Sequence, residues 1–202
     1  MVEFFQNGGA FMWPILGVLV VGLAFVGERL YHLIRAMETK SDFAASLSNQ
    51  ISSEGFDAAK KTCEDNVGPV ANLCYNALEV ADQGVDVAEK TLEQTAGIEM
   101  SALEKNMTWI SLCIATAPML GFLGTIAGMI VAFGQIAAAD NISPSIVAEG
   151  IGQALNTTAF GLVVAVILQF GQNIVMFIVD KIIITIQKST TLVLQSIANK
   201  NK

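Results

Sequence analysis

Two long runs without a charged residue constrain this chain more than any other feature. Residues 106–139 and residues 150–179 contain no Asp, Glu, Lys or Arg, and only a short polar segment separates them. Each run exceeds the roughly 20 apolar residues that span the hydrocarbon core of a bilayer. The two runs therefore predict a pair of membrane-spanning helices.

Small and polar residues interrupt both runs at helical spacing. They are Gly121, Gly124, Thr125 and Gly128 in the first run, and Gln153, Asn156, Thr157, Thr158 and Gly161 in the second. Small residues let membrane helices approach closely, whereas polar side chains are costly in lipid unless they face protein or water. The glycines therefore predict helix packing. The polar residues predict the wall of a polar or water-accessible path, with simple attachment of one helix to another as the alternative.

Composition supports an integral membrane protein over a soluble domain. Of the 202 residues, 53% are hydrophobic and 14% charged, and the mean hydropathy is +0.56. The formal net charge of −7 argues against nucleic-acid binding, because an acidic surface repels phosphate. Cys63, Cys74 and Cys113 lack metal-ligand spacing and predict reduced, structural thiols.

The N-terminal part predicts a first, shorter span. Residues 1–9 contain no Lys or Arg, so they lack the basic start of a secretory signal and are expected to be retained. Residues 10–26 form an apolar stretch, with Trp13 at an interfacial position and Glu28-Arg29 at its end. The single histidine, His32, follows at headgroup level.

A water-exposed helical region is expected between the first two spans. One helix is predicted over about residues 40–63, with a break near Glu54-Gly55. A second is predicted to begin after Gly68-Pro69, with an apolar stripe at a spacing of three and four residues that indicates helix-bundle packing. Because no proline lies between Pro69 and Pro118, this helix is expected to continue into the second span as one rod.

The expected fold class is all-α, an integral membrane protein with three transmembrane helices and long cytoplasmic helical extensions. Residues 1–37 are expected to form the N-terminus and span one, residues 38–106 the cytoplasmic helices, and residues 107–139 span two, with Pro118 as a kink. Residues 140–145 are expected to form a periplasmic turn, with Ser143 as N-cap and Pro144 opening the next helix. Span three is expected over residues 146–180, and a C-terminal helix packed against the cytoplasmic helices over residues 181–202.

The distribution of cations predicts the orientation. With three spans, residues 1–9 and the turn near residue 140 share one side and hold none of the 11 Lys and Arg residues. All 11 fall on the other side, and cations near spans stay in the cytoplasm. The N-terminus is therefore expected outside and the C-terminus inside.

The sequence predicts no catalytic constellation, no metal site and no cofactor, so an enzyme is not expected. A proton path through a membrane needs a titrating group, and the span interiors contain none. Glu149 lies near, at the outer mouth of the third span. If ions cross here, another chain is expected to supply the acid.

Two blocks resemble a known family. The segment of residues 118–133, with Pro118, Gly121, Gly124, Thr125 and Gly128, resembles the most recognisable block of the ExbB/TolQ/MotA ion-channel family. The segment of residues 150–162, running GIGQALNTTAFGL, resembles its second block. Glu28-Arg29 and the three-span layout with the N-terminus outside are closest to the ExbB/TolQ branch.

The resemblance implies a channel-forming stator subunit of an ion-driven motor in the bacterial inner membrane. It implies a ring-forming homo-oligomer, typically five copies, around two copies of a single-span ExbD/TolR-like partner that supplies a membrane aspartate. Ion flow would drive work in the periplasm or at the outer membrane. Thr125 and Thr158 match the family's pore threonines. A structural membrane scaffold without ion conduction is the alternative.

One departure leaves the transported ion open. ExbB and TolQ usually carry a glutamate five residues before the third-span threonine, where this chain has Gln153. Asn156 and Thr157 add oxygens that suit a dehydrating sodium ion. Both H+ and Na+ therefore remain as candidates.

Overall fold

The computed structural model describes residue 5 and residues 8–37, 43–66, 68–138 and 144–200. Every regular element in these residues is helical, so the predicted all-α fold class is confirmed. The predicted turn up to Ser143, including that N-cap, lies outside the described residues. Helix α8 begins at Pro144, the residue predicted to open it.

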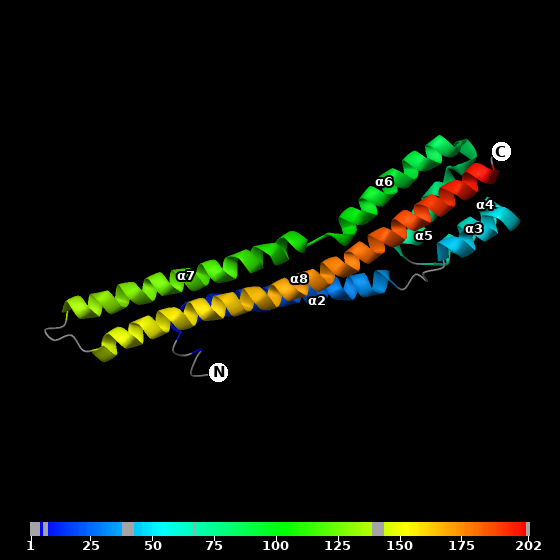
Figure 1. The fold of residues 1–202 in the computed structure, drawn as a ribbon. Coiled ribbons are helices and arrows are strands. Elements are labelled where there is room, and N and C mark those ends of the chain that lie inside the picture. The colour runs from blue at the N-terminus through cyan, green and yellow to red at the C-terminus, as the bar shows by residue number, and fades with distance from the viewer. Residues whose placement is uncertain (1–4, 6–7, 38–42, 67, 139–143, 201–202) are drawn as a thin grey trace. The chain divides into compact units, whose positions relative to one another are not determined.

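Three helical segments are long and apolar enough to cross a membrane, which agrees with the three predicted spans. The first is α2, Met12–Ala36. The second is centred on α7, Met107–Ala138, which continues through Pro118. The third lies within α8, Pro144–Lys200, a single helix that includes both the predicted third span and the predicted C-terminal helix. Figure 1 shows the order of these helices along the chain.

In the described residues between the first two spans, the chain forms four α-helices of 9 to 19 residues. They are α3 (Phe43–Ser53), α4 (Phe56–Glu64), α5 (Pro69–Glu79) and α6 (Val85–Leu103), with a 3₁₀ turn at Ala81–Gln83. Gly55 separates α3 from α4 at φ +100°, so the predicted break near Glu54-Gly55 is confirmed.

The expected single rod from Pro69 into the second span is wrong. Helix α5 ends at Glu79, and Gly84, at φ +115°, separates the following 3₁₀ turn from α6; α6 ends at Leu103, and Asn106, at φ +65°, stands directly before α7. Glycine and asparagine are the residues that adopt the left-handed region at least cost, and both commonly end helices. The Asn106 amide also donates to the Glu28 carboxylate at 2.9 Å, which fixes the second break.

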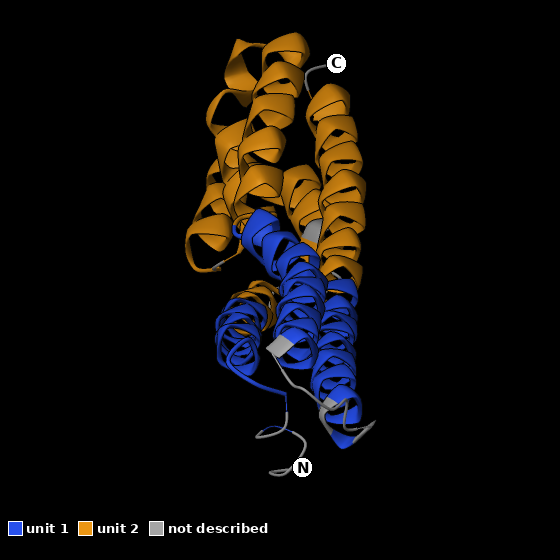
Figure 2. Ribbon diagram, turned by 90° about the vertical axis from the view of Figure 1, so that its left-hand side faces the viewer, with its two compact units in different colours: residues 1–28, 106–174 blue, residues 29–105, 175–202 orange. Residues whose placement is uncertain are grey.

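The chain divides into two compact units, coloured separately in Figure 2. The first, here called the span unit, comprises Met1–Glu28 and Asn106–Ile174; the second, the helical-extension unit, comprises Arg29–Lys105 and Val175–Lys202. The core of the span unit is formed by α2, α7 and α8. Its buried residues are Ile15, Cys113, Ala117, Val164, Ala165 and Leu168.

The end of α8 packs against α3 and α4 in the helical-extension unit, as the sequence predicts. The Ser48 and Ser196 hydroxyls are 2.7 Å apart, and Lys200 Nζ donates to the Ile51 carbonyl oxygen at 2.9 Å. The three cysteines are free thiols and buried. Burial, with a smaller contribution from Glu64, raises the pKa of Cys63 to about 12, so this thiol stays protonated at neutral pH.

Candidate functional site

Helices α7 and α8 approach so closely that backbone meets backbone. A Cβ atom on Gly161 would lie 2.6 Å from the Ala117 carbonyl oxygen, and one on Gly121 would lie 3.1 Å from the Thr158 Cα. Further along, a Cβ on Gly128 would lie 3.3 Å from that of Ala154. Figure 1 shows the two helices side by side and antiparallel in the span unit. The small residues therefore set the spacing of this helix pair.

Gly124 lies at the same interface but faces two neighbours. A Cβ there would contact the methyl group of Thr157 and lie 3.2 Å from the Cβ of Phe11. All four glycines predicted to pack helices are thus placed between α7 and its neighbours. Gly152, in contrast, has no atom within 4 Å of the position that a Cβ would take.

Thr125 of α7 and Thr158 of α8 face each other across this contact. Their hydroxyl oxygens lie within hydrogen-bond distance of each other. Thr125 Oγ1 also lies 3.2 Å from the Ala154 carbonyl oxygen, and Thr158 Oγ1 lies 3.2 Å from that of Gly121. Both side chains are half-buried.

The hydrogen bond between the two hydroxyls can run in either of two directions. If Thr125 donates to Thr158, Thr158 donates to the Gly121 carbonyl; if Thr158 donates to Thr125, Thr125 donates to the carbonyl of Ala154 or of Gly121. In both arrangements the protons are used within the chain while the oxygens keep lone pairs. The pair can therefore accept a hydrogen bond from a protonated acid or bind a cation without losing a bond of its own.

A second polar contact joins the same two helices. Gln172 Nε2 of α8 donates to Ser111 Oγ of α7 at 2.7 Å. Ser111 precedes Thr125 by 14 residues, and Gln172 follows Thr158 by 14, so the two contacts lie about 21 Å apart along the antiparallel pair at 1.5 Å per residue. This equal spacing is the signal by which sequence reasoning could have found the second contact, which it missed.

Thr157 belongs to a different contact, although it is adjacent to Thr158 in the sequence. Its side chain is 1% exposed, and its hydroxyl donates to the Gly8 carbonyl oxygen at 2.6 Å. Gln153 reaches the same segment, because a Cβ on Gly9 would lie 3.0 Å from its Cδ. The structure therefore places the Thr157 hydroxyl and Gln153 against the N-terminal segment, while the Thr157 methyl group lies against Gly124 of α7.

Aromatic residues hold this N-terminal segment on α8. The Phe5 ring packs edge-on against Trp13, with centroids 5.2 Å apart, and against Phe160 of α8, with centroids 5.9 Å apart. Asn156, the remaining residue predicted for the ion path, is half-buried. Gln169, eleven residues after Thr158 on α8, is exposed and donates to Asn173 of its own helix at 3.1 Å.

The threonine pair has no ionisable neighbour on its own helices. The whole of α7 lacks Asp, Glu, Lys and Arg, as does α8 from Gly150 to Val179. The nearest acid along α8 is Glu149, which is exposed and nine residues before Thr158. Within this part of the chain, the polar centre therefore consists of neutral hydroxyl and carbonyl oxygens alone.

Comparisons with known proteins agree with these features. The family model described as the MotA/TolQ/ExbB proton channel family matches residues 60–188. The chain is 27% identical to a biopolymer transport protein ExbB homolog of Methanothermobacter thermautotrophicus over 83% of this chain and 60% of the relative. It is 24% identical to a biopolymer transport protein ExbB-like 1 of Synechocystis over 82% of this chain and 66% of the relative.

A shorter match is more similar. The chain is 36% identical to the biopolymer transport protein ExbB of Xanthomonas campestris pv. campestris over 88 residues, which are 44% of this chain and 35% of the relative. The chain thus spans less than two thirds of the length of several of these relatives. The family match covers well over half of the chain, and the three apolar helices are those of a membrane protein. The chain therefore belongs to the MotA/TolQ/ExbB proton channel family.

Proposed function

We propose that this chain is the channel-forming stator subunit of an ion-driven motor in the bacterial inner membrane. The observation that carries the proposal is the Thr125–Thr158 hydroxyl pair, half-buried between two helices that contain no charged residue around it. Neutral oxygens of this kind guide an ion or a protonated acid without trapping it, because they add no fixed charge. The ExbB names of the relatives, which include the words biopolymer transport, support a role in transmitting energy.

The missing acid predicts the partner. A proton path needs a group that titrates, and the runs of residues 106–139 and 150–179 contain no Asp, Glu or His. We propose that two copies of a single-span ExbD/TolR-like protein supply a membrane aspartate next to the threonine pair. A ring of about five copies of this chain would surround them, with the exposed apolar faces of α7 and α8 in contact with neighbouring subunits and lipid.

The orientation follows from the cations. All 11 Lys and Arg residues lie on the side of the helical extensions, so we propose that these are cytoplasmic and that the N-terminal segment is periplasmic. Ion flow from the periplasm to the cytoplasm would then drive motion of the partner. The work would be delivered to the periplasm or the outer membrane.

We propose the proton as the coupling ion. The case for sodium depends on oxygens of Asn156 and Thr157, but the Thr157 hydroxyl is buried and bonded to Gly8. The Thr157 hydroxyl is therefore not part of the Thr125–Thr158 pair, where the path is proposed. The family as a whole is described as one of proton channels.

The replacement Thr158→Val tests the proposal. The complex is purified from the membrane with its single-span partner, reconstituted into vesicles under an imposed ion gradient, and assayed for flux. Because a hydrogen bond to a charged group contributes about 1.5–3 kcal/mol, flux is expected to fall about 10- to 100-fold while the complex still assembles. Thr191→Val is the matched control, since Thr191 is exposed and bonds only to Gln187 of its own helix, and its flux should stay unchanged.

Two results would decide against the proposal. If the complex carries no gradient-driven flux, or if Thr158→Val leaves the flux intact, the hydroxyl pair serves only to hold α7 and α8 together, as in a scaffold. Repeating the assay in sodium-free buffer tests the ion separately. Loss of flux on removing sodium would replace the proton by sodium without affecting the role of the threonine pair.

A further inference from the structure

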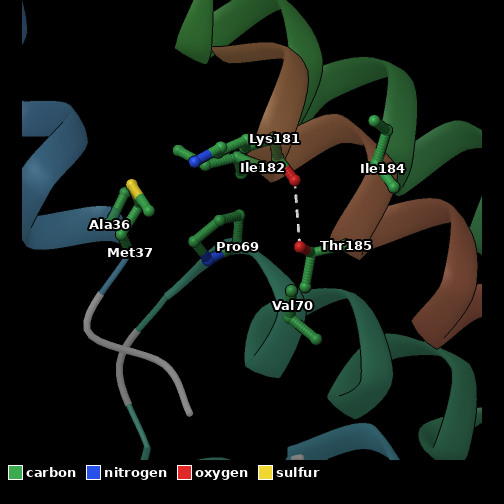
Figure 3. A pocket seen from close by; sticks show the side chains of 8 residues that line it. All are labelled: Ala36, Met37, Pro69, Val70, Lys181, Ile182, Ile184 and Thr185. Atoms are coloured by element: carbon green, nitrogen blue, oxygen red, sulfur yellow. Dashed lines mark hydrogen bonds between the residues drawn. The ribbon is translucent and has the colours of Figure 1, made fainter. Parts of the chain in front are cut away.

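A cavity of about 350 Å³ lies within the helical-extension unit, between the end of α2, the start of α5 and the middle of α8. Figure 3 shows the side chains that line it. They include Met37, Pro69, Val70, Lys181, Ile182 and Thr185. Most of this lining is apolar, so the cavity suits hydrocarbon better than water.

Lys181 is the one charged residue among the described residues that line the cavity. Lys181 is the first cation of α8 after the charge-free run ends at residue 179, and its side chain is exposed. Its ammonium group lies 4.5 Å from the centroid of the Phe177 ring, one turn earlier. Among the described residues no ion pair is formed by Lys181. Arg35, in the last turn of α2, is also exposed and directly precedes the lining residue Ala36.

On α8 these positions match the boundary between hydrocarbon and water. The charge-free run of α8 ends at residue 179, two residues before Lys181, so this part of the lining starts where a membrane-embedded helix reaches the headgroups. On α2 the lining residues Ala36 and Met37 follow Glu28 and Arg29 by about two turns, on the water side of the same boundary. Basic pockets between membrane helices on the cytoplasmic side are a recurrent type of site for anionic lipid headgroups.

We propose that this cavity binds one anionic phospholipid of the cytoplasmic leaflet. The phosphate would lie at Lys181 and Arg35, and one acyl chain would enter between Met37, Val70 and Ile182. The net charge of −7 repels anionic lipid from the chain as a whole, so retention of such a lipid has to come from a local cationic site. A bound lipid would connect α2, α5 and α8 within this unit.

Lipid retention by the purified complex tests the proposal directly. The complex is placed in nanodiscs with equal amounts of phosphatidylglycerol and phosphatidylcholine, released gently, and analysed by native mass spectrometry for bound lipid. Wild-type protein is expected to retain phosphatidylglycerol in preference. Lys181→Gln should reduce this preference about fivefold, the effect of one cation near an anionic surface. Lys188→Gln, an exposed cation two turns further along α8 and outside the lining, should leave it unchanged.

A second variant tests the acyl-chain part of the site. Ala36→Trp places a large side chain at the wall of the cavity, and retention of phosphatidylglycerol should drop below that of Lys181→Gln. Soluble glycerol phosphate in excess should not displace the lipid, because it has no acyl chain to bury. Equal loss in Lys181→Gln and Lys188→Gln, undiminished retention in Ala36→Trp, or displacement by glycerol phosphate would each overturn the proposal. None of these readouts uses ion flux, so their failure leaves the proposed motor function intact.

Discussion

The α7–α8 contact of the span unit and the interior of the helical-extension unit are packed in different ways. In the span unit, the contact between α7 and α8 is made by glycine against backbone, with Gly161 facing the Ala117 carbonyl and Gly121 facing Thr158. In the helical-extension unit, large apolar side chains fill the interior. Those that are fully buried include Leu47, Ile51, Leu73, Leu78, Ile186 and Ile197.

The difference follows from the solvent around each unit. In water, burying a leucine side chain removes apolar surface from solvent and contributes about 1.5–3 kcal/mol. In a bilayer the same burial gains little, because lipid tails are as apolar as leucine, and helices associate through close packing and hydrogen bonds instead. The interior of the helical-extension unit should therefore be sensitive to the loss of side-chain volume, and the α7–α8 contact of the span unit to its addition.

The largest effect is expected from volume loss in the helical-extension unit. Leu73 of α5 is fully buried, so Leu73→Ala should destabilise this unit by about 2–5 kcal/mol through lost transfer energy and a residual cavity. Hydrogen exchange of the α5 amides measures the opening free energy. Ile98→Ala on α6 is the control, because Ile98 is 70% exposed and should change stability by less than about 0.5 kcal/mol. Similar losses in both variants would show that burial does not stabilise this unit.

A smaller effect is expected in the span unit, where added side-chain volume, and not lost volume, should be destabilising. Gly161→Ala adds a single methyl group against the Ala117 carbonyl and should destabilise the α7–α8 pair by about 1–3 kcal/mol. Gly152→Ala on the same helix meets no neighbour and should be neutral, or stabilising by up to about 1 kcal/mol through helix propensity.

Thermal unfolding of the purified complex in detergent compares the two variants. We expect Gly161→Ala to lower the melting temperature and Gly152→Ala, on the same helix, to leave it unchanged or raise it. If both variants raise the melting temperature, the close approach of α7 and α8 does not exist in the membrane protein.

For the span unit, the sequence predicted which segments are helical better than it predicted which way their polar side chains point. The charge-free runs required long helices, and the glycines indicated where helices touch. The orientation of the polar side chains was not predictable, because Thr157 and Thr158 are adjacent and differ by about 100° around the helix. Only the position of neighbouring elements decides that the Thr158 hydroxyl meets Thr125 of α7 while the Thr157 hydroxyl bonds to Gly8.

The helix breaks near Gly84 and Asn106 show a different limit of prediction from sequence. Glycine and asparagine tolerate positive φ, but both also occur within helices, so Gly84 and Asn106 did not by themselves predict breaks between Pro69 and Pro118. Local preference for ending a helix at such a residue is about 1 kcal/mol, so tertiary contacts decide whether it does. The hydrogen bond from Asn106 to Glu28 joins residues 78 positions apart, which no local pattern reveals.

The smallest effect separates the two adjacent threonines. Thr157→Val removes the donor to the buried Gly8 carbonyl and should loosen the N-terminal segment by about 1 kcal/mol. Hydrogen exchange at residues 8–13, where the Met12 amide bonds to Gly9, should rise about fivefold while ion flux stays near the wild-type level. Thr158→Val should do the reverse, lowering flux with the N-terminal segment unchanged. If Thr157→Val instead abolishes flux and leaves exchange unaltered, the path runs along the Thr157 side of α8, and the N-terminal segment covers it.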